Sequence, residues 1–371
     1  MKKALKIILS IVLCLVLVIA GYVVYVFADY HRLDDHLVLE VDAAENGLAD
    51  PVDVGADKSY SIATFNVGFG AYDHDFDFFM DGGHQSWGRS KEAVTNNINT
   101  SASSLAVIDP DFMMIQELDT NATRSYHINE ADLFSETFPA HHKVFAQNYD
   151  SPFLFWPLYQ PHGSTQAGIM TYSLYPISSS ERRSLPISDS VSKLVDLDRC
   201  YSINRIPCSD GHDLVLVNLH LSAYGADPSI MESQRAILFE DLVKEYEAGN
   251  YVIAGGDFNH DMAGDSNTRF DNAISESESW AQPFDFDCIP EHFTLGTQKV
   301  LFEQGGQLAP TCRDTGRVYD GTNDTWILDG LIYSDNIEML DYNTLDLDFV
   351  SSDHNPVYMQ FRFLPAAETA R

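Results

Sequence analysis

The stretch YVIAGGDFN, residues Tyr251–Asn259, is the part of the chain around which the rest is organised. Its apolar start predicts a buried strand, and its two glycines let the backbone turn or approach another group closely. Asp257 and Asn259 then follow two residues apart, and on extended backbone such side chains point the same way. A carboxylate accepts a proton or faces a cation, and a carboxamide donates to an anionic oxygen. A polar turn that merely closes a strand explains the stretch equally well, so its meaning depends on the other strand ends.

The composition fits a folded protein with a large core. The chain has 371 residues, 45% of them hydrophobic, enough for one large domain or two ordinary ones. The formal net charge is −33, from 55 acidic and 22 basic residues. Such a charge argues against nucleic-acid binding by phosphate neutralisation, but it leaves open an enzyme in which bound cations neutralise the substrate.

The N-terminus carries a membrane-anchor pattern. Three lysines precede an uncharged apolar run at 7–27, which is long enough to span a bilayer, and aspartates follow it. This asymmetry predicts a cytoplasmic tip (1–6), a transmembrane anchor (7–27) and an extracytoplasmic remainder in a single-pass cell-membrane protein. The alternative is a signal peptide cleaved after Ala28, which would release a secreted protein. Residues 28–58 are predicted to be a juxtamembrane spacer, 59–363 one α/β domain, and 364–371 a C-terminal tail.

The cysteines leave two interpretations open. No CxxC pair occurs, which argues against a zinc ribbon. Cys200, Cys208, Cys288 and Cys312 lie in the exported part, where one or two disulfides are plausible, with Cys200–Cys208 as the local pair. The other interpretation is that all four are small core residues.

Residues 59–363 alternate between apolar strands and amphipathic helices. Strands are predicted at 61–65, 112–115, 168–172, 199–206, 214–219, 251–254, 330–333 and from 357, and helices at 89–107 and 228–246. Polar side chains stand beside or within these strands. They are Asn66, Glu117, His220, Asp257, Asn259, Asp329, Asp353 and His354. One alone is commonly structural, but this many favour a single pocket at the edge of packed sheets.

The chain resembles the endonuclease/exonuclease/phosphatase superfamily. The resemblance rests on the motifs that contain these residues, which occur in the order FN, IQE, NLH, GDFN, LD and SDHNPV. That superfamily includes DNase I-like nucleases, neutral sphingomyelinases and inositol-polyphosphate phosphatases, and the resemblance covers nearly all of 59–363. It implies a four-layer α/β/β/α sandwich, in which two mixed sheets face each other with helices outside. It also implies Mg²⁺-dependent hydrolysis of a phosphoester, with Mn²⁺ as a possible substitute, by in-line attack of water.

The resemblance also implies a role for each residue. Glu117 matches the principal Mg²⁺ ligand, with Asn66 beside it and the Asp353 carboxylate near the metal. Asp257 matches the residue that orients or deprotonates the water, and Asn259 the residue that holds a phosphate oxygen.

Three histidine and aspartate positions complete the implied set. His220 matches the histidine that stabilises charge on the phosphate. Asp329 and His354 match a pair in which the carboxylate orients the imidazole. Together these groups agree with hard-cation chemistry, because Mg²⁺ is held by few carboxylates and donors stabilise the charge that develops.

Two features depart from the pattern of the superfamily. Its nucleases often carry a second acid at the position of Gly68; here an acidic loop, 69–88, follows instead, and we interpret it as solvated rather than as a second cation site. The arginine or tyrosine that contacts phosphate in some members has only candidates here, namely His162, Arg182 and Arg183.

The sequence does not identify which phosphoester is the substrate. A lipid headgroup or small phosphoester outside the membrane, an extracellular nuclease substrate and a catalytically inactive binding scaffold are the alternatives, with no obligate protein partner evident. The segment 153–159, FLFWPLY, is either an aromatic loop that enters a bilayer interface or a covered core segment.

Overall fold

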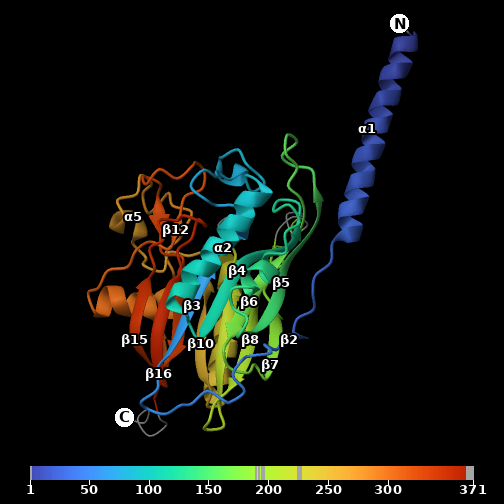
Figure 1. The fold of residues 1–371 in the computed structure, drawn as a ribbon. Coiled ribbons are helices and arrows are strands. Elements are labelled where there is room, and N and C mark those ends of the chain that lie inside the picture. The colour runs from blue at the N-terminus through green and yellow to red at the C-terminus, as the bar shows by residue number, and fades with distance from the viewer. Residues whose placement is uncertain (1, 189, 191–192, 194–196, 224–227, 365–371) are drawn as a thin grey trace.

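The computed structural model describes residues 2–188, 190, 193, 197–223 and 228–364. Two seven-stranded sheets lie against each other, and a long N-terminal helix stands apart from them (Figure 1). In spatial order the first sheet contains β1 (Leu37–Val38), β7 (Ser179–Ser184), β8 (Cys200–Pro207), β9 (Asp213–His220), β10 (Tyr251–Asp257), β14 (Asp329–Ser334) and β11 (Phe293–Leu295). The second contains β15 (Ile337–Thr344), β16 (Val357–Phe363), β3 (Tyr60–Asn66), β4 (Phe112–Ala122), β6 (Gly163–Ser173), β5 (His142–Leu154) and β2 (Val41–Asp42).

Smaller elements complete the fold. A two-stranded sheet pairs β12 (Cys312–Arg313) with β13 (Thr325–Trp326). The helices are α1 (Lys2–Asp29), α2 (Lys91–Ile108), α3 (Glu130–Ser135), α4 (Pro228–Glu247), α5 (Ser266–Arg269) and α6 (Gly296–Gln298). Single turns are η1 (Gly68–Gly70), η2 (Phe79–Asp81), η4 (Phe286–Cys288) and η5 (Lys299–Glu303).

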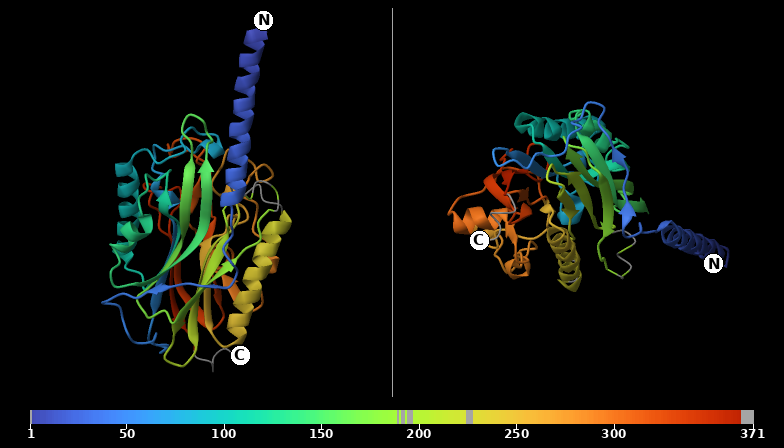
Figure 2. Two further views of the ribbon diagram at one scale, coloured as in Figure 1. Left: turned by 90° about the vertical axis from the view of Figure 1, so that its right-hand side faces the viewer. Right: turned by 90° about the horizontal axis from the view of Figure 1, so that it is seen from below.

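The alternation of side chains in the central strands explains the layers. In β3 and β4, Ile62 and Met114 belong to the core between the sheets, whereas Ala63 and Met113 pack on the opposite face with α2 and α3. Since both faces of these strands are buried, the strands are apolar throughout. Helix α4 covers the first sheet through Leu238 and the rest of its apolar side. Helices therefore flank two facing mixed sheets, which confirms the predicted four-layer sandwich (Figure 2).

Several predicted boundaries differ in the structure. The strand expected to end near Glu117 continues to Ala122, because a bulge between Ile115 and Leu118 absorbs the polar pair. Within the segment predicted as a spacer, β1 pairs with β7 and β2 pairs with β5. Those residues are thus edge strands of the sheets. The predicted tail lies outside the described residues except for Leu364.

The disulfide interpretation is wrong for the described residues, in which all five cysteines are free. Cys200 begins β8 and Cys208 directly follows its last residue, so an extended strand of roughly 3.3 Å per residue keeps their sulfurs far apart. Cys200, Cys208 and Cys312 are buried, as expected of small core residues.

The N-terminal helix α1 is long and apolar enough to cross a membrane. It has 28 residues, and its most apolar part is not buried by the rest of the protein. Such a helix is an anchor or a signal sequence by length and composition.

Candidate active site

Strand register places the first three polar side chains in a row. Asp257, the last residue of β10, is paired with His220 in the parallel neighbour β9 and with Asp329 in the antiparallel neighbour β14. Gly256 makes the close pairing possible, because a Cβ there would lie 2.0 Å from the carbonyl oxygen of Leu219. The sequence motifs NLH, GDFN and LD therefore meet because their strands are adjacent.

The facing sheet supplies Asn66 and Glu117 through the bulge in β4. Glu117 has a left-handed backbone (φ 59°), and the preceding Gln116 turns into the core, where it donates to Asn218 Oδ1 at 2.7 Å. A non-glycine residue in this conformation is strained, and such strain commonly marks a functional site. The Asn66 amide donates to Glu117 Oε1 at 3.1 Å and to Asp257 Oδ2 at 3.0 Å. One carboxamide thus joins the carboxylates of the two sheets.

Glu117, His220 and Asp257 form a group of the size of a cation site. His220 Nε2 lies 3.7 Å from Glu117 Oε1 and 3.6 Å from Asp257 Oδ2. One ligand atom from each of the three residues lies within 4.8 Å of the other two. The sequence predicted that these groups converge, and the structure brings them together.

Asp329 and His354 form the predicted Asp-His pair. His354 Nδ1 lies 2.7 Å from Asp329 Oδ2, and its Nε2 faces Asp257 Oδ2 at 3.8 Å. The second carboxylate oxygen of Asp329, Oδ1, is buried without a hydrogen-bond partner among the described residues. The carboxylate thus orients the imidazole toward Asp257.

Burial and crowding shift the pKa values of this cluster. Burial, reinforced by the charge of Asp329, raises the pKa of Asp257 to about 7. Burial also raises the pKa of Asp353 to about 6, with Glu117 as the main like-charged neighbour. Oxygen donors of this kind fit a hard divalent cation such as Mg²⁺.

The two histidines shift in opposite directions. Burial would lower the pKa of His354, but the charge of Asp329 and its hydrogen bond outweigh this and raise it well above the ordinary value. For His220, burial lowers the pKa well below the ordinary value, and the charge of Arg199 adds to the shift. The surroundings therefore favour the protonated form of His354 and the neutral form of His220.

Asp353 occupies the space next to Gly68. A Cβ on Gly68 would lie 2.8 Å from Asp353 Oδ1, and the residue has a left-handed backbone (φ 53°). The position at which related nucleases often carry an acid therefore has no room for one here, because Asp353 reaches it from another loop.

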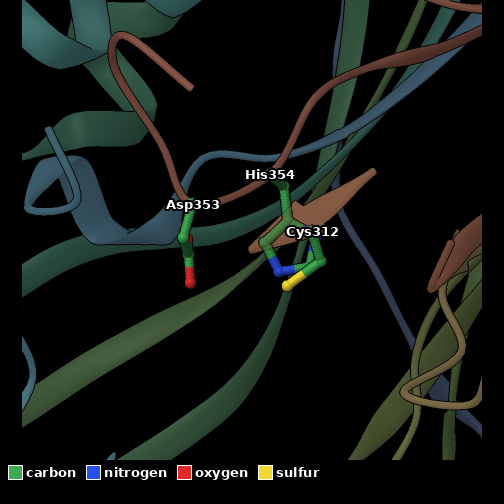
Figure 3. A group of neighbouring side chains, drawn as sticks. All are labelled: Cys312, Asp353 and His354. Carbon is green, nitrogen blue, oxygen red and sulfur yellow. The ribbon is translucent and has the colours of Figure 1, made fainter. Parts of the chain in front are cut away.

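A cysteine that sequence reasoning missed lies on the other side of His354. Figure 3 shows Cys312 beside the His354 ring, and one ligand atom from each of Cys312, Asp353 and His354 lies within 4.8 Å of the other two. Burial raises the pKa of the Cys312 thiol to about 12, so the thiol is neutral and packs against the imidazole. No signal in the sequence pointed to it, since Cys312 belongs to the short strand β12 outside both large sheets.

Asn259 does not follow the extended geometry expected of it. Its backbone is left-handed (φ 52°), and its N–H donates to Asp257 Oδ1 at 2.8 Å, which makes a turn directly after β10. Its side-chain amide donates to the carbonyl oxygen of Leu221 at 2.8 Å. The amide has a second hydrogen, which is enough for one further acceptor.

A cavity of about 400 Å³ opens above Glu117 and His220. Its remaining lining is mostly aromatic, apolar or basic, with one carboxylate, Asp81, and one carboxamide, Asn148. The other lining residues are Phe69, Tyr72, Phe78, Met80, Arg124, Tyr149, His162, Ala167, Leu197, Arg199 and Ala223. Arg199 is buried, and its Nε and Nη1 have no hydrogen-bond partner among the described residues. Such donors, buried and unsatisfied beside the cluster, are available for an anionic ligand.

The predicted phosphate contacts are only partly supported. His162 lines the cavity, and burial lowers its pKa to about 3. Arg182 instead bonds to Asp198 at 3.2 Å, and Arg183 pairs with Asp35 at 3.1 Å, so these two arginines serve the edge of the first sheet. Sequence reasoning treated Arg199 only as the first residue of the predicted strand 199–206, because no motif surrounds it; in the structure it directly precedes β8.

The acidic loop 69–88 is more structured than predicted. Phe69, Tyr72 and Phe76 form a buried aromatic cluster. Asp73 pairs with Arg89 at 2.7 Å and Asp77 with His84 at 2.8 Å. Among the described residues, none of the acid, histidine and cysteine groups at metal-binding distance falls in this loop.

The structure has two facing sheets, and carboxylates, histidines and amides gather at the ends of their strands. This arrangement defines a class, the DNase I-like phosphoester hydrolases. The profile of the Endonuclease/Exonuclease/phosphatase family matches residues 63–354, and the chain belongs to that family.

Solved structures share the fold at low sequence identity. An endonuclease/exonuclease/phosphatase from Beutenbergia cavernae is 16% identical, with a TM-score of 0.56 over 83% of this chain and 72% of that one. The human nocturnin catalytic domain with a bound sulfate is 16% identical (TM-score 0.53; 88% and 97% covered). D. rerio TDP2 with a single-stranded DNA product is also 16% identical (TM-score 0.52; 82% and 100% covered). No curated protein matches the sequence.

Proposed function

We propose that this protein is a Mg²⁺-dependent phosphodiesterase or phosphatase, with Mn²⁺ as an alternative ion, that acts on lipid headgroups or small phosphoesters. The observation that carries the proposal is the Asn66 amide, which holds Glu117 and Asp257 of opposite sheets on one side-chain nitrogen. Asn66, Glu117 and Asp353 are the residues that would hold the ion. A bound Mg²⁺ lowers the pKa of water and offsets charge on phosphoryl oxygens.

Asp257 is the proposed base. Its carboxylate has a raised pKa of about 7, which suits a group that accepts a proton near neutral pH. Because Asn66 and the Asn259 backbone fix both carboxylate oxygens, Asp257 can orient an attacking water in line with the leaving oxygen.

The donors lie around the same point. His354, cationic and oriented by Asp329, presents Nε2 toward Asp257 and can donate to a phosphate oxygen. His220 and the second hydrogen of the Asn259 amide add neutral donors where charge develops. Arg199 would receive a further anionic oxygen at the cavity wall.

The proposed location is the outer face of a membrane. Helix α1 would span the bilayer with residues 7–27, leave 1–6 in the cytoplasm and place the catalytic domain outside. Cleavage after Ala28 would instead release the enzyme. In both cases the strongly acidic domain meets its substrate outside the cytoplasm.

An extracellular endonuclease is the second candidate. The TDP2 structure with its DNA product favours it only at the level of the fold, because the sequences are 16% identical. The net charge of −33 opposes it, since a polyanion approaches an acidic domain unfavourably. A catalytically inactive scaffold is the least favoured candidate, because the site retains a complete set of acid, base and donor groups.

The test is a substrate panel on the purified full-length chain. Hydrolysis of bis-p-nitrophenyl phosphate with and without Mg²⁺ distinguishes an enzyme from a scaffold. Release of phosphocholine from phosphatidylcholine or sphingomyelin, measured beside plasmid nicking, distinguishes the lipid substrate from DNA. Plasmid nicking as the dominant activity would replace the first candidate with the second.

A further inference from the structure

The loop between β5 and β6 exposes an unusual amount of apolar surface. Phe155, Trp156, Leu158 and Tyr159 are 52%, 67%, 77% and 69% exposed. Residues 153–159, called the hairpin tip below, contain no charged side chain, and neither do the residues on either side from 151 to 163 apart from His162. Scattered apolar residues are normal on a surface, but contiguous ones mark an interaction site. The alternative that the segment is covered core is wrong.

The hairpin tip contacts the apolar helix α1. Tyr22 donates its hydroxyl to the carbonyl oxygen of Phe153 at 3.0 Å, and the Phe153 N–H donates to the Tyr25 hydroxyl at 3.0 Å. The rings of Tyr22 and Phe155 are 5.1 Å apart in an edge-to-face arrangement. Figures 1 and 2 show the hairpin rising beside the lower end of α1.

The position of this contact along α1 sets its depth. Tyr22 and Tyr25 lie about 10 Å and about 6 Å before Asp29, at 1.5 Å per helical residue. That is the depth at which amphipathic elements settle in the headgroup region, roughly 5–10 Å, and where tyrosine and tryptophan are enriched. The hairpin tip reaches the same level.

We propose that the hairpin tip enters the outer interface of a zwitterionic bilayer beside α1 and acts as a second membrane contact. A neutral bilayer fits best, because the tip is uncharged and the chain as a whole carries a net charge of −33, which an anionic surface would repel. Aromatic side chains supply the affinity, since no basic side chain lies on the tip.

The hairpin tip is braced from the side of the active site. Tyr159 donates its hydroxyl to the carbonyl oxygen of His84 at 2.5 Å, and Trp87 Nε1 donates to the carbonyl oxygen of Pro161 at 2.7 Å. Both partners belong to the loop 69–88, which also forms one wall of the cavity through Phe69 and Met80.

The hairpin strands also line the cavity. Tyr149 on β5, Ala167 on β6 and His162 between them all face it. If the tip is in the interface, the mouth of the cavity lies at the membrane surface. This consequence rests on the proposed function and identifies the substrate as a lipid headgroup delivered from the same bilayer.

The direct test is fluorescence quenching of the full-length protein in phosphatidylcholine vesicles. Lipids brominated near the headgroup end of their acyl chains quench tryptophan at interfacial depth. We expect strong quenching in the wild type and loss of most of it in Trp156→Phe, because Trp87, Trp280 and Trp326 lie in the folded domain. High salt should leave the quenching unchanged, since the contact is aromatic.

Three results would overturn the proposal. They are equal quenching in Trp156→Phe and the wild type, quenching that high salt abolishes, and an unquenched Trp156 that aqueous acrylamide also fails to reach. The last would show that a protein surface covers the tip. None of these readouts depends on activity.

A second experiment tests substrate delivery. The double variant Phe155→Ser/Trp156→Ser should hydrolyse vesicle lipid at least about tenfold more slowly, while its rate on soluble bis-p-nitrophenyl phosphate stays unchanged. The control Leu340→Ser/Val350→Ser removes two exposed apolar residues elsewhere, which are 43% and 45% exposed, and should change neither rate. Parallel losses on both substrates would contradict delivery, and inactivity on both in the wild type would reject the proposed function while the quenching result stands.

Discussion

The strand-end cluster and the strands that carry the hairpin tip line the same cavity, but the cluster and the tip are built on opposite principles. At the cluster, Asp257 is 2% exposed and tied by hydrogen bonds from both sheets, so its position is set by the core. At the tip, Trp156 is 67% exposed and has no role in the core. The comparison teaches that chemistry and substrate access are separable in this molecule. The chemistry depends on the register of buried strands, whereas access to the substrate depends on an exposed apolar surface.

Metal removal should have the largest effect on the rate of hydrolysis and should act only through the strand-end cluster. Chelation with EDTA is expected to abolish hydrolysis of every phosphoester, and Mg²⁺ should restore it. Because an ion that binds only the native state stabilises it, Mg²⁺ should also raise the melting temperature in calorimetry. Full activity in EDTA would remove the metal from the proposed function.

Asp257→Ala should reduce the rate by at least about a hundredfold on both soluble and membrane substrates, as expected for loss of an acid-base group. The assay is the rate on bis-p-nitrophenyl phosphate, with Glu247→Ala on the exposed end of α4 as the matched control. Circular dichroism should show that both variants fold. Wild-type activity in Asp257→Ala would reject the assigned base.

Asp329→Asn should cost roughly ten- to a hundredfold in kcat, since the neutral amide no longer holds His354 as a cation. NMR titration of His354 should show its pKa falling from its raised value toward the ordinary range. An unchanged His354 titration would show that Asp329 does not orient or charge it.

Arg199→Gln should raise KM about tenfold and change kcat less, because the guanidinium binds an anionic oxygen away from the reacting bond. Arg199→Lys should recover part of the affinity through its charge. If Arg199 were only structural, both variants would show the same fall in melting temperature and an unchanged KM. That result would contradict substrate binding by Arg199.

Substitution in the hairpin tip should have the smallest effect. Leu158→Ser is expected to change the free energy of unfolding by no more than about 0.5 kcal/mol, because its side chain is 77% exposed. Chemical denaturation measures this, with Leu216→Ser in the core as the contrasting variant. A large loss for Leu158→Ser would mean that the tip belongs to the fold and would weaken the comparison.

The sequence predicted much of the site because its strands are short and their ends polar. His220, Asp257 and Asp329 each follow or end an apolar run, so register brings these three into one row, and Asn66 ends a strand of the facing sheet. Two residues at the site escaped prediction. Arg199 lines the cavity, and Cys312 packs against His354 from the short strand β12, but neither carries a periodic signal. The left-handed backbone at Glu117 and Asn259 was also not predicted, because side-chain patterns do not encode it.

The amino-acid sequence by itself determined the class of the fold, the family, the apolar N-terminal helix and most of the strand-end groups, since these follow from local hydrophobic periodicity and motif order. Only the tertiary structure decided that the cysteines are free, that Arg182 and Arg183 point away from the pocket while Arg199 lines it, and that the aromatic segment 153–159 is exposed against α1. The physical reason is that each of these depends on which distant segments pack together, and burial, charge balance and exposure exist only after that packing has formed.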